Sequence, residues 1–173
     1  GRLVNAGEAT INGRVAGGAV NSGALTINAA GRVENGLVAD GGATVNAGRI
    51  EGGAVVRSGV LTSSGVIEGG LADAGLVKAT GTIAGPIAVT GKLIVGDGTA
   101  TGEKLTIAPG STLTGVVTVP VDLTTGRSNF LAAKGAAVSA ARLDLAGRLT
   151  NASGAYWGAL SLSDAAIALT PEA

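Results

Sequence analysis

Residues 48–58 read GRIEGGAVVRS and residues 65–75 read GVIEGGLADAG, and the likeness of these two stretches decides the fold. The same pattern returns in units that begin at Gly13, Gly31, Gly48, Gly65 and Gly81, with starts 18, 17, 17 and 16 residues apart. Each unit holds three short apolar patches separated by Gly, Asn, Asp or Ser. The sequence therefore contains an imperfect repeat of three short strands and three turns, with a period of roughly 17 residues.

This repeat argues against α-helix and favours stacked β-strands. Glycine interrupts the pattern every few positions, and each such glycine would cost a helix about 1 kcal/mol. A unit of three short strands cannot bury its own apolar side, but stacked units pair strand on strand at about 4.8 Å and satisfy each other's backbone groups. We therefore predict an all-β fold, a parallel β-solenoid with short rungs of roughly 17 residues and a less regular C-terminal part.

Alternation along each strand assigns an inside and an outside to the rungs. The third residue of each unit is expected to point inward and to form an aliphatic core stack of Val15, Val33, Ile50, Ile67 and Ile83. The residues that flank this stack are expected to point outward as two surface charge ladders, Arg14, Arg32 and Arg49 on one side and Glu34, Glu51 and Glu68 on the other.

The two charge ladders allow two interpretations. The favoured one is a surface network in which neighbouring columns of opposite charge neutralise each other. The alternative is a hard cation held by the glutamate column, but no further ligands complete its coordination shell, so no metal site is predicted. Neither catalytic nor cofactor-binding residues can be nominated.

Two other polar columns are assigned by their residue type. Asparagines near the unit boundaries, at positions 12, 21, 28, 35 and 46, are interpreted as turn residues that bond to equivalent residues of the next rung. Threonines at 10, 26, 44 and 62 supply only one Thr per unit, whereas a regular ice-binding ladder would need a flat, repeated Thr-x-Thr column.

We expect residues 1–102 to form regular rungs and residues 103–173 to form irregular rungs and a C-terminal cap. The alanine-rich stretch 131–141 is assigned to strand in preference to helix, because Gly135 and Val138 weaken a helix there. Tyr156 and Trp157 are candidates for a cap that covers the last rung, with sugar stacking as the alternative role.

Composition excludes several functions. The 12 basic and 12 acidic residues cancel and form no basic cluster, so no nucleic-acid partner is predicted. The chain has no Cys, His or Met, and only three aromatic residues, all after residue 129. Asp40, Asp73 and Asp97 lie beside Gly or Ala in expected turns, so no acid/base pair is available and the chain is predicted not to be an enzyme.

The ends and the hydropathy of the chain bear on its location. No apolar run approaches the ~18 residues needed to span a bilayer, so this segment is not expected to insert into a membrane. The first residues lack the layout of a signal peptide, which favours a mature or excised segment.

The units Gly48-Arg-Ile-Glu-Gly-Gly and Gly65-Val-Ile-Glu-Gly-Gly, with residues 102–114 (GEKLTIAPGSTLT), resemble the passenger domains of bacterial autotransporters and related large surface adhesins. The resemblance implies a right-handed β-helix that is displayed at the bacterial cell surface or released. It also implies a structural, adhesive stalk with a surface, host or cell-cell receptor that the sequence does not identify. Residues 103–173 would correspond to the folding nucleus of that family, and a monomer is expected.

The same units also resemble bactofilins, cytoskeletal proteins whose small β-helices polymerise end to end. This second resemblance is the alternative. A polymer would sediment as filaments, whereas a passenger segment would remain monomeric.

Overall fold

The computed structural model describes residues 1–96 and 105–122, with side chains through residue 115, and five strands farther along the chain. Rungs 1 and 2 comprise β1 (Leu3–Asn5), β2 (Glu8–Ile11), β3 (Arg14–Val15), β4 (Ala19–Asn21), β5 (Ala24–Ile27) and β6 (Arg32–Val33). Rungs 3 and 4 comprise β7 (Leu37–Asn46), β8 (Arg49–Ile50), β9 (Ala54–Ser63) and β10 (Val66–Glu68). Rungs 5 and 6 comprise β11 (Leu71–Asp73), β12 (Leu76–Ala79), β13 (Gly81–Ala84), β14 (Pro86–Val95) and β15 (Leu105–Ile107). The described residues contain no helix.

Parallel pairing between successive rungs builds the fold. A 13-stranded and an 8-stranded sheet result, and each rung contributes strands to both. The register steps through rungs 1 to 6 are 16, 18, 17, 17 and 16 residues, along the series Leu3, Ala19, Leu37, Ala54, Leu71 and Ile87. The predicted β-solenoid of roughly 17 residues per rung is therefore confirmed.

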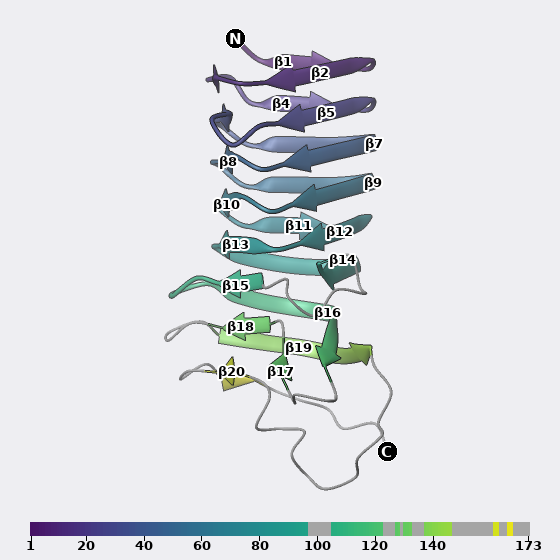
Figure 1. Ribbon diagram of the computed structural model, residues 1–173, viewed down its shortest axis with the longest axis vertical. Coiled ribbons are helices and arrows are strands. Elements are labelled where there is room, and N and C mark those ends of the chain that lie inside the picture. Colours follow the sequence, from purple (N-terminus) through teal and green to yellow (C-terminus); the bar gives the residue numbers. More distant parts are fainter. Residues whose placement is uncertain are drawn as a thin grey trace, which may run out of the picture.

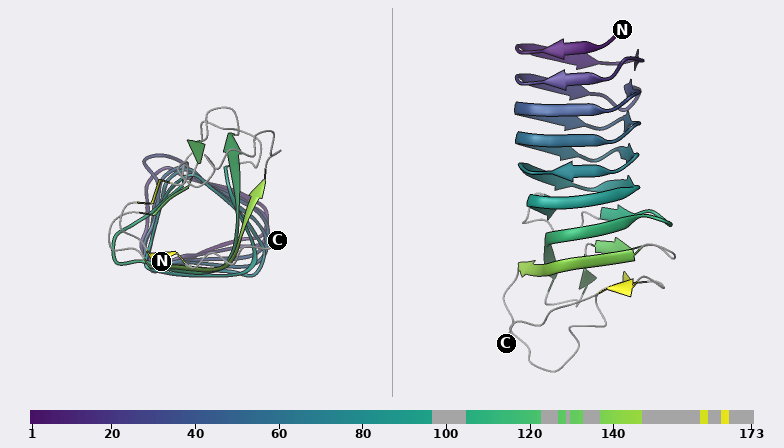
Figure 2. Two further views of the ribbon diagram at one scale, coloured as in Figure 1. Left: turned by 90° about the horizontal axis from the view of Figure 1, so that it is seen from below. Right: turned by 180° about the vertical axis from the view of Figure 1, so that it is seen from behind.

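The coil has three faces, which Figure 2 shows end-on in its left panel. The first face consists of β1, β4, β11 and the first parts of β7, β9 and β14, and the second face of β2, β5, β12 and the last parts of those long strands. The third face is the 8-stranded sheet. In Figure 1 the strands of the far side run left to right and those of the near side right to left as the chain descends, so the coil is right-handed.

Aliphatic side chains from all three faces fill the interior. Leu37 of the first face, Leu61 of the second and Ile67 of the third are fully buried and belong to one continuous core. Burying one such side chain stabilises the fold by about 1.5 to 3 kcal/mol. Because each rung supplies only a single layer of inward side chains, it depends on its neighbours to cover that layer.

Glycines make the corner between the third and first faces. Gly53 and Gly70 there have φ of +87° and +100°. A Cβ added at Gly70 would collide with the carbonyl oxygen of Pro86 in the next rung. This corner therefore needs glycine both for its left-handed backbone and for the close approach of stacked rungs.

The corner between the first and second faces takes two forms. In rungs 1, 2 and 5 a side-chain oxygen accepts the amide N–H of the glycine two residues later, at 3.3, 3.1 and 2.9 Å, in the pairs Asn5 with Gly7, Asn21 with Gly23 and Asp73 with Gly75. This turn breaks the rung into two separate strands. In rungs 3, 4 and 6, Ala39, Val56 and Val89 take the equivalent place and β7, β9 and β14 run through the corner, with register shifts.

The coil continues beyond rung 6 with a longer step. Ile87 pairs with Leu113, which is 26 residues later, and residues 97–104 between them lie outside the described part. The later strands are β16 (Thr112–Asp122), β17 (Arg127–Ser128), β18 (Phe130–Ala132), β19 (Ala137–Ala146), β20 (Ser161–Leu162) and β21 (Ala166–Ile167). All of them pair in parallel except β17, which forms an antiparallel pair with β16. Within the alanine-rich stretch 131–141 the described residues belong to the strands β18 and β19.

Candidate functional site

The candidate core stack lies on the inner side of the third face. Its members pair in register through β3, β6, β8, β10 and β13, from Val15 to Ile83. Val33, Ile50, Ile67 and Ile83 are buried, whereas Val15 is only partly buried. Ile107 of β15 extends the stack by one position.

The candidate charge ladders lie outside the same strands and are offset by one rung. Arg14 of rung 1 donates two hydrogen bonds to Glu34 of rung 2, at 2.6 and 2.7 Å. The next pairs follow the same rule, Arg32 with Glu51 at 2.7 Å and Arg49 with Glu68 at 2.7 Å. Arg32 also lies 3.3 Å from Glu34 of its own rung. Each arginine thus binds the glutamate of the following rung.

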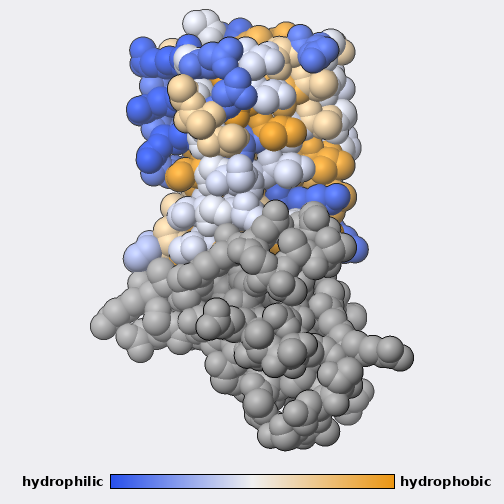
Figure 3. All heavy atoms as spheres, in the orientation of Figure 1, coloured by the Kyte–Doolittle hydropathy of each residue, from blue (hydrophilic) through white to orange (hydrophobic). Residues whose placement is uncertain are grey.

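This offset explains where the ladders end. Rung 1 carries Arg14 and has Ala16 in the glutamate column, while rung 4 carries Glu68 and has Val66 in the arginine column. Three arginines therefore meet three glutamates without a surplus at either end. Figure 3 shows hydrophilic residues gathered along the left edge of the upper coil, where the strands of the third face lie in Figure 1.

The ladder is an exposed network with mild electrostatic effects. The hydrogen bond from Arg14 holds the pKa of the Glu34 carboxyl below its ordinary value, against an opposing effect of desolvation. The same bond raises the pKa of Arg14. Because Arg14, Arg32 and Arg49 keep about half or more of their side-chain surface in solvent, screening limits what the network contributes to stability.

Arginine guanidinium groups already contact the glutamate carboxylates to which a cation would have to bind. At least one carboxylate oxygen of Glu34, Glu51 and Glu68 accepts a bond from a guanidinium. Within the described residues no three His, Cys, Asp or Glu side chains form a group that could hold a metal ion.

Bonds between equivalent asparagines of successive rungs were expected, and they occur in the pairs Asn5 with Asn21 and Asn12 with Asn28. The sequence analysis missed that one such polar ladder lies inside the coil. Asn5 donates to Asn21 at 2.8 Å, and Asn21 donates to the Thr44 hydroxyl at 3.0 Å, all three being buried. A second interior bond joins Asn46 to Ser63 at 3.0 Å. Asn21 and Asn46 are therefore interior residues, although both also hold a turn. The signal that distinguishes them is a glycine two residues later, in Asn5-Ala-Gly7, Asn21-Ser-Gly23 and Asn46-Ala-Gly48.

Asp73 is the exception inside the coil. It is 2% exposed and stacks between Val56 and Val89. Its Oδ1 accepts the Gly75 N–H at 2.9 Å, as expected for turn chemistry, but Oδ2 has no partner. Burial raises the pKa of Asp73 to about 6, although the bond from Gly75 acts in the opposite direction. It is the one charged side chain among the buried residues that the structure describes.

The threonines do not form one exposed column. Thr10 and Thr26 pair on the outer side of the second face, but Thr44 points inward and Val45 takes the next outward place. Thr62 and Lys78 follow Val45 in the column. The outer second face is thus a mixture of hydroxyl, apolar and basic side chains.

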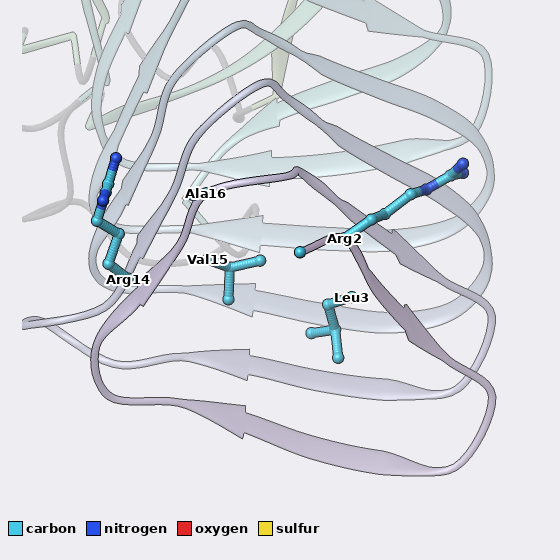
Figure 4. A pocket seen from close by; sticks show the side chains of 6 residues that line it. Arg2, Leu3, Arg14, Val15 and Ala16 are labelled. Carbon is cyan, nitrogen blue, oxygen red and sulfur yellow. The ribbon is translucent and has the colours of Figure 1, made fainter.

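The described surface includes one hollow, at the N-terminal end of the coil beside rung 1. It encloses about 440 Å³ and is lined by Gly1, Arg2, Leu3, Arg14, Val15 and Ala16. Figure 4 shows Leu3 and Val15 pointing into the mouth of the coil, with Arg2 and Arg14 pointing away from it. The hollow exposes the end of the core, and no reactive groups meet there.

The remaining predictions concern the C-terminal cap and insertion into a membrane. Tyr156 and Trp157, and therefore the proposed cap, lie outside the described residues. The described part contains no helical segment long and apolar enough to cross a bilayer. No protein-family model, curated protein or solved structure matches this chain. Its class is therefore defined by its own strand pairing, as a parallel β-solenoid.

Proposed function

We propose that this chain is a rigid, non-catalytic passenger or stalk segment of a secreted or surface-displayed bacterial protein, which serves adhesion or display. The observation that carries the proposal is the continuous parallel pairing of rungs 1 to 6 along the first face, around one shared core. Six rungs at about 4.8 Å give a rod of about 30 Å with a fixed rise. Such a rod suits a spacer that holds contact surfaces at a set distance.

The outer surface supports contact with a protein or cell surface better than contact with nucleic acid. The arginines of the charge ladder already bind glutamates, so the third face offers little net positive charge to phosphates. The receptor would therefore meet neutral or charge-balanced faces. The resemblance to autotransporter passengers and surface adhesins supports the same assignment.

Location provides the test. An epitope-tagged version of the chain, produced in its own cells, is labelled by antibody without permeabilisation, and intact cells are then treated with protease. A surface passenger is labelled and digested from outside, and the purified protein then binds to target cells. Protection from protease in intact cells, with sedimentation of the purified chain as filaments, would instead support the bactofilin-like alternative.

A further inference from the structure

An apolar column runs along the outside of the first face. It consists of the middle residue of each strand, and parallel pairing places these residues directly above one another in the order Val4, Val20, Val38, Val55, Ala72 and Ala88. Val4 is 71% exposed and Val55 is 38% exposed. The right panel of Figure 2 shows this face turned toward the reader as a flat stack of strands.

The residues on either side of this column are small or form a neutral ion pair. On one side lie the corner glycines, with Gly36 and Gly53 in rungs 3 and 4. On the other side Asp40 of rung 3 and Arg57 of rung 4 form an ion pair at 2.9 Å. Apart from Arg2 at the end of the column, no other charged side chain lies on this face in rungs 1 to 6. A contiguous exposed apolar strip of this kind is typical of an interaction surface.

We propose that the first face binds the same face of a second copy of this chain, with the two coils antiparallel. The twofold axis runs parallel to the strands and passes between rungs 3 and 4. Val38 then lies opposite Val55 of the second copy, and Val20 lies opposite Ala72 of the second copy. Farther out Val4 faces Ala88 of the second copy, so that the larger residues of one end meet the smaller residues of the other.

The charged residues favour this register over the registers in which one coil is shifted by one rung. Asp40 lies opposite Arg57 of the second copy and Arg57 opposite Asp40 of the second copy, so the two ion pairs form one cluster of alternating charge. A shift that places the axis on rung 3 or rung 4 would set Asp40 against its own copy, or Arg57 against its own copy. Like charges would then be buried together, which disfavours these registers. The contact is isologous and closes at two copies.

The size of the face predicts how strong this pairing is. Six rungs at about 4.8 Å and a face about five residues wide give roughly 450 Å² per copy, against about 800 Å² in a standard stable interface. The pair is therefore weak and forms at high protein concentration. A chain that is monomeric when dilute is consistent with it, and the pairing does not depend on the proposed function.

Sedimentation equilibrium of the purified chain tests the pairing, from about 10 µM to about 1 mM. We expect the average mass to rise toward twice that of one chain, and not beyond it. Val55→Lys should weaken association at least tenfold, because it places an ammonium group against Val38 of the second copy. Val45→Lys is the matched control, since Val45 is an outward valine of similar exposure (43%) on the second face. Ala72→Lys provides a second disruptive variant, and thermal melts establish that each variant is folded.

A charge exchange tests the register. Asp40→Arg should weaken association, and the double variant Asp40→Arg/Arg57→Asp should restore it, because the alternating cluster is rebuilt with reversed signs. The proposal is overturned by a single-chain mass at every concentration, by growth beyond two copies, by equal effects of Val55→Lys and Val45→Lys, or by a double variant that associates no better than Asp40→Arg.

Discussion

The inner and outer walls of the coil are separated by a single residue step, yet different energetics govern them. In β8, Arg49 lies in the exposed charge ladder while its neighbour Ile50 is fully buried. The inner wall is narrow and dry, so an uncompensated charge there has no solvent to relax into. The outer wall is screened by water, so its ion pairs are individually weak. Asp73 is the exception, because its ionisable carboxyl group lies on the inner wall.

The largest effect is expected when a charge is forced into the core stack. Ile67→Asp buries a carboxylate between Ile50 and Ile83 and should lower the free energy of unfolding by several kcal/mol. Val66→Asp in the same strand is the control, since position 66 continues the arginine column and lies beside Arg49. Chemical denaturation should show a large loss for the first variant and almost none for the second. Similar losses in both would remove the distinction between the two walls.

A smaller but still large effect is expected at the glycine corner. Gly70→Ala combines a left-handed backbone with a collision against the Pro86 carbonyl in the next rung, at a cost of about 3 kcal/mol or more. Gly110→Ala is the control, because Gly110 has a similar φ of +75° but no atom within 4 Å of an added Cβ. The control should lose only about 1 kcal/mol, the cost of the backbone conformation alone. Equal losses in thermal melts would show that rung contact adds nothing to the need for glycine.

The buried carboxyl predicts an unusual dependence of stability on pH. The pKa of Asp73 in the folded chain, about 6, is raised above its unfolded value, so the folded state holds this proton more tightly. Its contribution to stability is complete below the unfolded pKa and is lost as the pH rises through about 6. The change between pH 4 and pH 7 should be about 2 kcal/mol, in the direction of greater stability in acid. Glu34, with its lowered pKa, acts in the opposite sense and loses its contribution as the pH falls.

Asp73→Asn isolates this contribution. The new amide would repeat the two carbonyl bonds of Asn21, whose Nδ2 donates to the Gly23 and Ala43 carbonyls. Leu93 stands where Asn21 has its third acceptor, Thr44. We expect the variant to be more stable than the natural chain at pH 7, to differ little at pH 4, and to lack the transition near pH 6. A variant that is less stable at pH 7 would show that the carboxylate is satisfied in the folded chain.

The smallest effect belongs to the charge ladder. Glu51→Gln removes one partner of Arg32 and should change the melting temperature by no more than about 2 °C. The difference should shrink further in high salt. A chelator at constant ionic strength should leave the natural chain unchanged, and a clear loss of stability would instead indicate a cation on the glutamate column.

Much of the fold was predictable from local pattern. The glycine-punctuated units and their spacing predicted an all-β solenoid with roughly 17 residues per rung, and the structure confirms it. Alternation of side chains placed Ile50 inside and Arg49 outside, where the structure has them. These features are accessible because a strand's period of two and a rung's repeat are properties of short stretches of chain.

Other features required the stacked rungs. Asn21 and Asp73 share a turn signal, yet only the stack shows that both side chains point into the core and that Asp73 lies between Val56 and Val89 without a second partner. The separation of Thr44 from Thr26 likewise follows from the registers around the corner of β7.

By itself the sequence determined the period, the inner and outer walls and the residue types that each wall carries. The tertiary structure alone decided that the arginine and glutamate ladders are offset by one rung, that an Asn ladder lies within the core, and that the first face presents a continuous apolar column. The physical reason is that each of these is a relation between rungs about 17 residues apart. Such relations depend on the register of parallel pairing and on how each corner bends, and both are set by the rungs above and below.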